Sequence, residues 1–96
     1  MPSSKEYLDY VLDLLREVPN ISYRKMMGEY ILYKDSIIFG GVYDNRFLVK
    51  KAKSLETYSF EEVIPYPSAK PMYLVESENV DEIEEIVKKV VKDLAK

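Results

Sequence analysis

The hydrophobic positions of this chain change their period twice. Near the N-terminus they recur at helical spacing with polar residues between them, at Leu8, Val11, Leu12, Leu15 and Val18. Ser3 and Glu6 match the capping box, in which each side chain satisfies a free backbone amide at the start of a helix. Pro19-Asn20 ends the pattern, so the first segment is predicted to be an amphipathic helix with one face to bury.

A run of strand-forming residues from Ser22 to Lys51 follows, broken by two polar pairs. Asp35-Ser36 and Asp44-Asn45 each separate two runs rich in β-branched and aromatic residues. Asp and Asn tolerate the left-handed backbone of tight hairpins, so both pairs predict turns of an antiparallel meander. Gly28 predicts a bulge or sharp bend in the first run. The residues from Tyr23 to Met27 are then a short extra strand or the bent start of the same strand.

The remainder of the chain predicts a short helix or turn, a brief strand and a long helix. Ala52 to Tyr58 is the short helix or turn, and Met72 to Val75 is the strand. Asn79 can cap the last helix, whose apolar stripe is Ile83, Ile86, Val87, Val90 and Leu94. The order is helix, three to four antiparallel strands, short helix, one to two strands, long helix. It predicts an α+β fold with the helices packed on one face of a mainly antiparallel sheet.

The two faces of this sheet suggest a binding surface. Pairing outward from the two turns assigns one nearly apolar face to the core under the helices: Ile31, Tyr33, Ile38, Gly40, Val42, Phe47 and Val49. The opposite face is also largely apolar, whereas a solvated antiparallel face is mostly polar. An apolar patch rimmed by charge is typical of a protein interface. The predicted interface residues are Tyr30, Leu32, Phe39, Tyr43, Arg46, Leu48 and Lys50. The alternative is that the last helix or the loop from Tyr58 to Tyr66 covers this face.

Composition narrows the chemistry. The chain of 96 residues is 47% hydrophobic, enough for one core, so residues 1–96 are predicted to form a single domain. It has no Cys and no His, which excludes disulfides and thiolate metal sites and removes the commonest general base. We therefore expect no catalytic residues, no metal, no cofactor and no enzymatic activity. No apolar stretch approaches the roughly 20 residues of a membrane span, so we expect a soluble, cytoplasmic protein without membrane contact.

Charge argues against independent binding to nucleic acid. The net charge is −3, while affinity for nucleic acid comes mainly from basic groups on phosphates. Arg24, Lys25, Lys51 and Lys53 are a local basic surplus interleaved with tyrosines, and they are the candidate contacts if such binding occurs. Neighbouring strand residues point to opposite faces, however, so a doublet such as Arg24-Lys25 does not make one patch.

Three segments together resemble a known family. SSKEYLDYVLDLL, SYRKMMGEYILYKDSIIFGGVYDNRFLVK and YPSAKPMYLVE are similar to the N-terminal domain of the TfoX/Sxy competence-regulator family, and the most specific piece is RKMMGEYILYKDSIIFG. The resemblance implies an α+β fold ordered helix, three strands, helix, two strands, helix. The family's best-known members carry a further C-terminal domain and act as transcriptional coregulators in natural competence. This chain is expected to be a stand-alone copy without that second domain.

We therefore expect a non-enzymatic regulatory or protein-interaction module, linked to transcription or competence regulation, that binds itself as a homodimer or binds another protein. One alternative is a domain that contacts nucleic acid or nucleoprotein. The third is a small-ligand-binding domain or an enzyme, for which Pro65-Tyr66-Pro67 could act as a lid and Tyr73 could line a pocket. The loop can also be purely structural.

Overall fold

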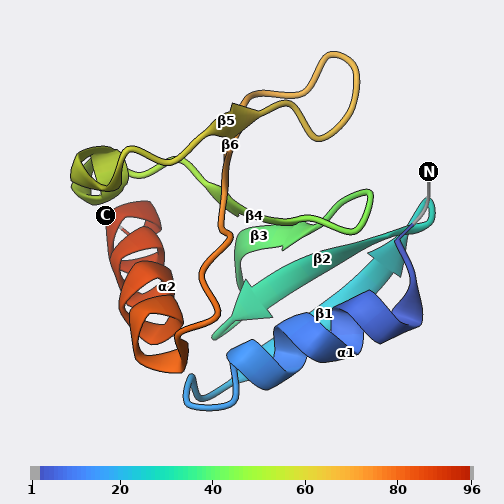
Figure 1. The fold of residues 1–96 in the computed structure, drawn as a ribbon, viewed down its shortest axis with the longest axis horizontal. Helices are drawn as coiled ribbons and strands as arrows, with labels where there is room; N and C mark the ends of the chain where they lie inside the picture. The colour runs from blue at the N-terminus through green and yellow to red at the C-terminus, as the bar shows by residue number, and fades with distance from the viewer. Residues whose placement is uncertain (1–2, 96) are drawn as a thin grey trace.

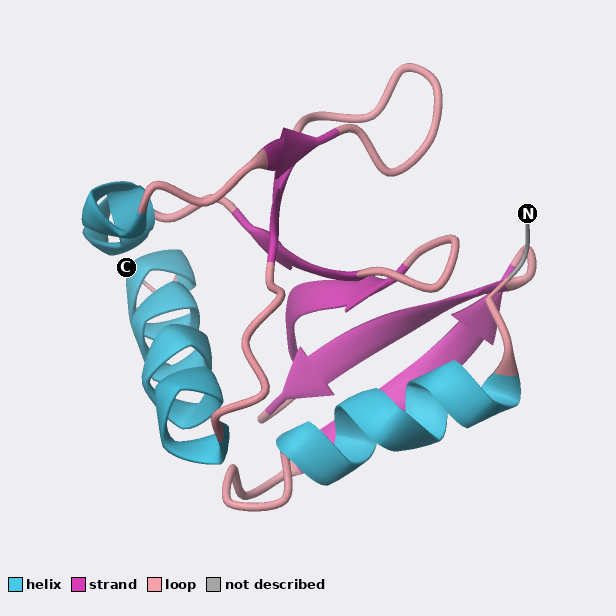
Figure 2. Ribbon diagram, viewed as in Figure 1, coloured by secondary structure: helices cyan, strands magenta, loops and turns pink. Residues whose placement is uncertain are grey.

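The protein is an α+β domain with two helices on one face of a six-stranded antiparallel sheet. The computed structural model describes residues 3–95, so the ends of the expected domain 1–96 lie outside the described residues. The elements are α1 (Lys5–Leu14), β1 (Ile21–Met26), β2 (Glu29–Lys34), β3 (Ile37–Val42), β4 (Phe47–Lys50), the 3-10 helix η1 (Lys53–Tyr58), β5 (Glu62–Val63), β6 (Met72–Leu74) and α2 (Val80–Leu94). The predicted fold class and element order are confirmed (Figures 1 and 2).

The first four strands form a meander joined by three two-residue hairpin turns. Met27-Gly28, Asp35-Ser36 and Asp44-Asn45 all have positive φ angles, as tight hairpins that match the twist of the strands require. The two polar turns were predicted correctly. Gly28 is neither a bulge nor a bend inside a strand, because with φ 82° it is the second residue of the first turn. The residues before it form β1, the separate extra strand that the sequence left as one alternative.

The strand order is β1-β2-β3-β4-β6-β5, so β1 is an edge strand. Between β3 and β4 the predicted register is confirmed, with Gly40 opposite Val49 and Val42 opposite Phe47. The sheet bends strongly toward its other end, and β5, β6 and the loop between them rise away from α1 (Figure 1).

Between β2 and β3 the predicted register is wrong beyond the turn. Tyr33 lies opposite Ile38 as expected, but the register then shifts and Leu32 lies opposite Gly40. Phe39 is the additional residue of a β-bulge. A shift by one residue moves a strand's side chains to the opposite face of the sheet. The predicted faces of β2 and of the first half of β3 are therefore exchanged.

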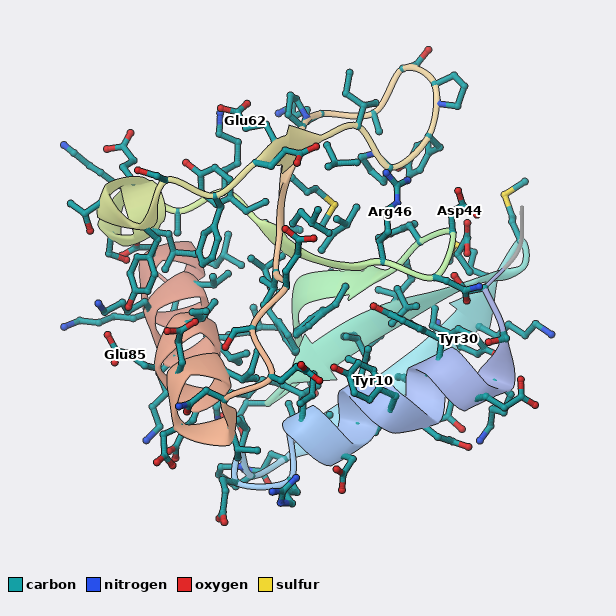
Figure 3. The ribbon with its side chains drawn as sticks, in the orientation of Figure 1. Tyr10, Tyr30, Asp44, Arg46, Glu62 and Glu85 are labelled. Carbon is teal, nitrogen blue, oxygen red and sulfur yellow. The ribbon has the colours of Figure 1, made fainter. Side chains whose placement is uncertain are left out.

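This exchange corrects three predicted interface residues. Tyr30, Leu32 and Phe39 face the helices and lie in the hydrophobic core, with 5%, 0% and 0% of their surface exposed. Figure 3 shows Tyr30 beside α1. The residues predicted for the core at these positions lie on the helix-free face instead: Ile31, Tyr33 and Ile38.

Each helix is capped by a side chain. Ser4, and not the expected Ser3, caps α1: its Oγ accepts a hydrogen bond from the Tyr7 amide at 3.1 Å. Asn79 caps α2 as predicted, with Oδ1 accepting from the Glu82 amide at 3.0 Å. A cap of this kind contributes about 1 kcal/mol.

A single core lies between the helices and the sheet. Leu8 and Val11 of α1 and Ile83 and Val87 of α2 are fully buried in one cluster with Phe39. Burial of each such side chain contributes roughly 1.5–3 kcal/mol. Within residues 3–95, no helix is both long enough and apolar enough to cross a membrane.

Ser3 ties the N-terminal segment to two hairpins. Its Oγ donates to the Glu29 carboxylate at 2.6 Å and accepts from the Asn45 amide at 3.0 Å. The Glu29 carboxylate also accepts from the Asp44 amide at 3.2 Å. The start of α1, the first turn and the third turn are thereby held together at one end of the sheet.

Candidate binding groove on the helix-free sheet face

The sheet face that carries no helix contains a groove of about 760 Å³. This lies within the range of roughly 300–1,000 Å³ that is usual for ligand pockets. Its lining comes from β1, β2, β3, β4, β6, the loop 64–71 and the end of α2: Met26, Ile31, Tyr33, Ile38, Gly40, Tyr43, Lys50, Lys51, Pro65, Tyr66, Ala69, Lys70, Pro71, Met72 and Leu94.

The floor of the groove follows from the bulge in β3. Because the register shifts there, Ile31, Tyr33 and Ile38 point away from the helices. Ile38 keeps 38% of its surface exposed although it lies within the sheet. Three large side chains therefore present an apolar floor that the described residues leave open.

The loop 64–71 forms one wall. The Ala69 amide donates to the Tyr66 carbonyl at 3.1 Å, and Ser68 has a φ of 74°, so the loop turns tightly here. The Tyr66 ring is 57% exposed and lies 6.2 Å from the Tyr43 ring. The expected Pro65-Tyr66-Pro67 loop thus contributes an aromatic side chain to the groove.

Tyr43 packs inward beneath this wall. Its ring covers Gly41, where a Cβ atom would lie 2.7 Å from the ring and 2.6 Å from the Tyr30 carbonyl oxygen. Burial raises the pKa of the Tyr43 hydroxyl, with smaller contributions from Tyr66 and Glu29. The tyrosine is therefore a neutral, polar member of the groove at physiological pH.

Lysines are the only charged residues among the described residues that line the groove. Lys50, Lys51 and Lys70 line it, and no Asp or Glu is among the described lining residues, although the chain has more acidic than basic residues. Lys51 is paired with Glu62 at 3.1 Å, and this hydrogen bond raises the lysine pKa. Among residues 3–95, Lys50 and Lys70 form no ion pair.

The other four predicted interface residues lie in different places. Tyr43 and Lys50 line the groove, as described. Leu48 lies opposite Gly41 on the helix-free face but has no exposed surface, so it cannot contact a partner directly. Arg46 is at the β3–β4 hairpin beside Asp44 (Figure 3), where its Nε donates to the Tyr43 carbonyl at 3.3 Å.

The four candidate nucleic-acid contacts are not brought together. Arg24 lies opposite Ile31 on the groove side of β1, while Lys25 lies opposite Tyr30 on the helix side. Lys51 is engaged with Glu62, and Lys53 belongs to η1. The structure therefore distributes them over both faces of the sheet.

Outside the groove, the structure offers a polar contact between η1 and α2 and a smaller cleft. Tyr58 donates to Glu85 at 2.5 Å and accepts from Lys89 at 3.0 Å, which joins η1 to α2. A smaller cleft of about 340 Å³ lies between α1 and the segment 74–77, beside Tyr7 and Tyr10. Across the described part of the chain, no group of three or more carboxylates is placed to hold a metal ion.

Several groove residues were missed by the sequence analysis. Ile31, Tyr33 and Ile38 were assigned to the core because the bulge was not foreseen. Lys70, Met72 and Leu94 are far from the meander in sequence and reach the groove only through the fold. The sequence feature that pointed to these residues was the apolar character of both sheet faces. It indicated that apolar side chains would also lie on the face without helices.

Comparison with models of known protein families finds no match to this chain, and comparison with curated proteins finds none either. The groove is therefore interpreted from its geometry, its charge and the pattern of its residues. An open apolar floor, an aromatic wall and a basic rim can bind a partner by burial and charge complementarity.

Proposed function

We propose that this protein is a non-enzymatic regulatory or protein-interaction module that binds its partner through the groove on the helix-free sheet face. One observation carries the proposal: both helices cover one face of the sheet, while the other presents an open groove with Ile38, Met26 and Tyr66 exposed. Contiguous exposed apolar surface bordered by charge is typical of interaction sites.

The chemistry of the lining supports a binding role. Aromatic and methionine side chains are common at binding surfaces, and two of the four methionines, Met26 and Met72, line the groove. Tyrosine hydroxyls and lysines are the polar groups present, and such groups set the orientation and choice of a partner.

The resemblance to the TfoX/Sxy N-terminal domain supports a regulatory role in the cytoplasm, in transcription or competence. The element order of the protein, with one strand more before the short helix, is close to the order that this resemblance implies. The partner is a second copy of the chain or another protein.

The test is the solution mass of the protein, by light scattering coupled to size exclusion, across a range of concentrations. Self-association through the groove gives a mass near twice 11.3 kDa for the wild type. If the wild type is such a dimer, Ile38→Glu should return the mass to that of the monomer while circular dichroism stays unchanged, because Ile38 is partly exposed. Ile64→Glu is the matched control, since Ile64 is 57% exposed and does not line the groove.

The outcomes separate clearly. A dimer that survives Ile38→Glu places the interface elsewhere and contradicts the proposal. A dimer lost in Ile38→Glu and kept in Ile64→Glu supports it. A monomer at all concentrations excludes a second copy as the partner, and the proposal then requires a different protein.

A further inference from the structure

We infer that the occupant of the groove is an acidic segment of another protein that carries an apolar or aromatic side chain. This inference rests on the proposed interaction role of the groove and selects between its two possible partners. It is carried by the charge distribution: the described lining contains Lys50, Lys51 and Lys70 and no carboxylate, in a protein of net charge −3.

Two of the groove lysines, Lys50 and Lys70, lie near each other where β4 pairs with the start of β6. Lys50 lies opposite Met72 at the end of β4, so these two side chains share the groove face. Lys70 comes from the loop 64–71 that forms the wall. Neither lysine has an internal ion pair among the described residues, so both ammonium groups can meet carboxylates of a partner. Arg24, opposite Ile31 on the same face, adds positive charge beyond the floor.

The floor selects an apolar anchor beside these charges. Ile31, Ile38 and Met72 provide apolar surface, and Tyr33 and Tyr66 add aromatic rings. A side chain such as Phe or Leu that enters here exchanges water for apolar contacts. The flanking carboxylates then reach the lysine rim, where charge complementarity raises specificity and association rate.

The same charges argue against a second copy that binds face to face. In a two-fold symmetric dimer the same patch meets itself, so one interface would gather the lysines of both grooves without a carboxylate from the described lining of either. Like charges brought together in this way disfavour the complex. A partner that contributes carboxylates has no such penalty.

The test compares three labelled hexapeptides by fluorescence anisotropy against the whole protein. All share a central Phe-Leu pair, flanked on each side by two glutamates, two glutamines or two lysines. We expect the glutamate peptide to bind about tenfold more tightly than the glutamine peptide and the lysine peptide most weakly, with an advantage that shrinks at high salt.

Charge variants locate the binding. Lys50→Glu and Lys70→Glu are each expected to weaken binding of the glutamate peptide several-fold and to strengthen binding of the lysine peptide. Lys25→Glu changes the net charge equally but lies opposite Tyr30, on the helix side of the sheet, so it is expected to change neither affinity by more than twofold. Circular dichroism of every variant checks that the fold is retained.

Each contrary outcome has its own meaning. Equal affinity for the three peptides overturns the inference of an acidic partner. So does a Lys25→Glu effect as large as that of Lys50→Glu or Lys70→Glu. In either case, loss of peptide binding in Ile38→Glu would still support the groove as an interaction site. Absence of binding by all three peptides overturns the inference. A dimer that Ile38→Glu dissociates also overturns it, because the occupant is then a second copy, although the proposed function stands.

Discussion

Single residues show how closely the turns of this sheet are specified. Gly40 lies at the bulge, where an added Cβ would collide with the backbone oxygen of Leu48 and lie 2.9 Å from the Cα of Val49. The Gly40-Gly41 pair therefore serves close packing of strands and of Tyr43. Two of the three hairpin turns use Asp, Asn or Ser at positive φ, while Met27 holds the same conformation with a long apolar side chain.

Met27→Asn is expected to stabilise the protein by about 1 kcal/mol, because Asn tolerates the left-handed backbone better than Met does. Met27 has a φ of 52° and is 96% exposed, so the substitution loses almost no burial. The urea midpoint should rise with an unchanged slope. Met26→Asn is the matched control: that residue is in β1, where Asn is disfavoured, and its midpoint should not rise.

The helices and strands are joined by a few specific polar contacts in addition to the core. The long helix α2 is tied to η1 by the Tyr58, Glu85 and Lys89 side chains, and Figure 3 shows Glu85 on the side of α2 near η1. The Tyr58 hydrogen bond first, and then Lys89, hold the pKa of Glu85 below its ordinary value of 4.5. The same contacts raise the pKa of Lys89.

A pH dependence of stability follows from the lowered pKa of Glu85. A depressed carboxyl pKa contributes stability above the unfolded-state pKa, and this contribution is lost as pH falls through the folded-state value. The free energy of unfolding should therefore decrease as pH falls below about 4.5, and part of this decrease should be absent in Glu85→Gln. Urea unfolding at a series of pH values measures it. Glu78→Gln, which removes an exposed carboxylate ahead of α2, should leave that part of the decrease in place.

The molecule as a whole has two layers, helices and sheet, and the two faces of the sheet differ in how far they are covered. The helices and the sheet enclose one core cluster, and the groove side lies outside this cluster. Leu48 and Tyr43 are nevertheless buried on the groove side. The groove side is thus partly packed, beside Gly41 and Leu74, and partly open, over Ile31 and Ile38.

Leu48→Glu is expected to unfold the protein, because it places a carboxylate where no surface is exposed. Lys50→Glu, two residues further along β4 and on the same face, should keep the fold since Lys50 is partly exposed. Far-ultraviolet circular dichroism and urea titration compare the two variants. A folded Leu48→Glu protein with weakened association would instead return Leu48 to the interface.

Local pattern was sufficient for most of the elements and for the register of one strand pair, β3 with β4. Helical spacing, the polar turn pairs and the Asn79 cap act within a few residues, so they are visible in the chain itself. The sequence also showed that both faces of the sheet are largely apolar, although the helices cover only one of them. This pattern predicted apolar surface outside the core. The β3–β4 register followed from its turn because no bulge intervenes.

The β2–β3 register and the composition of the groove were decided by tertiary packing. The residues from Tyr30 to Tyr33 are apolar or aromatic on both faces, so their pattern does not distinguish one register from a register shifted by one. Close approach of the β3 backbone to β4 at Gly40, with burial of Phe39 under the helices, selects the bulge. Lys70, Met72 and Leu94 join Ile31 only because the chain folds back across the sheet, a long-range arrangement that no local periodicity encodes.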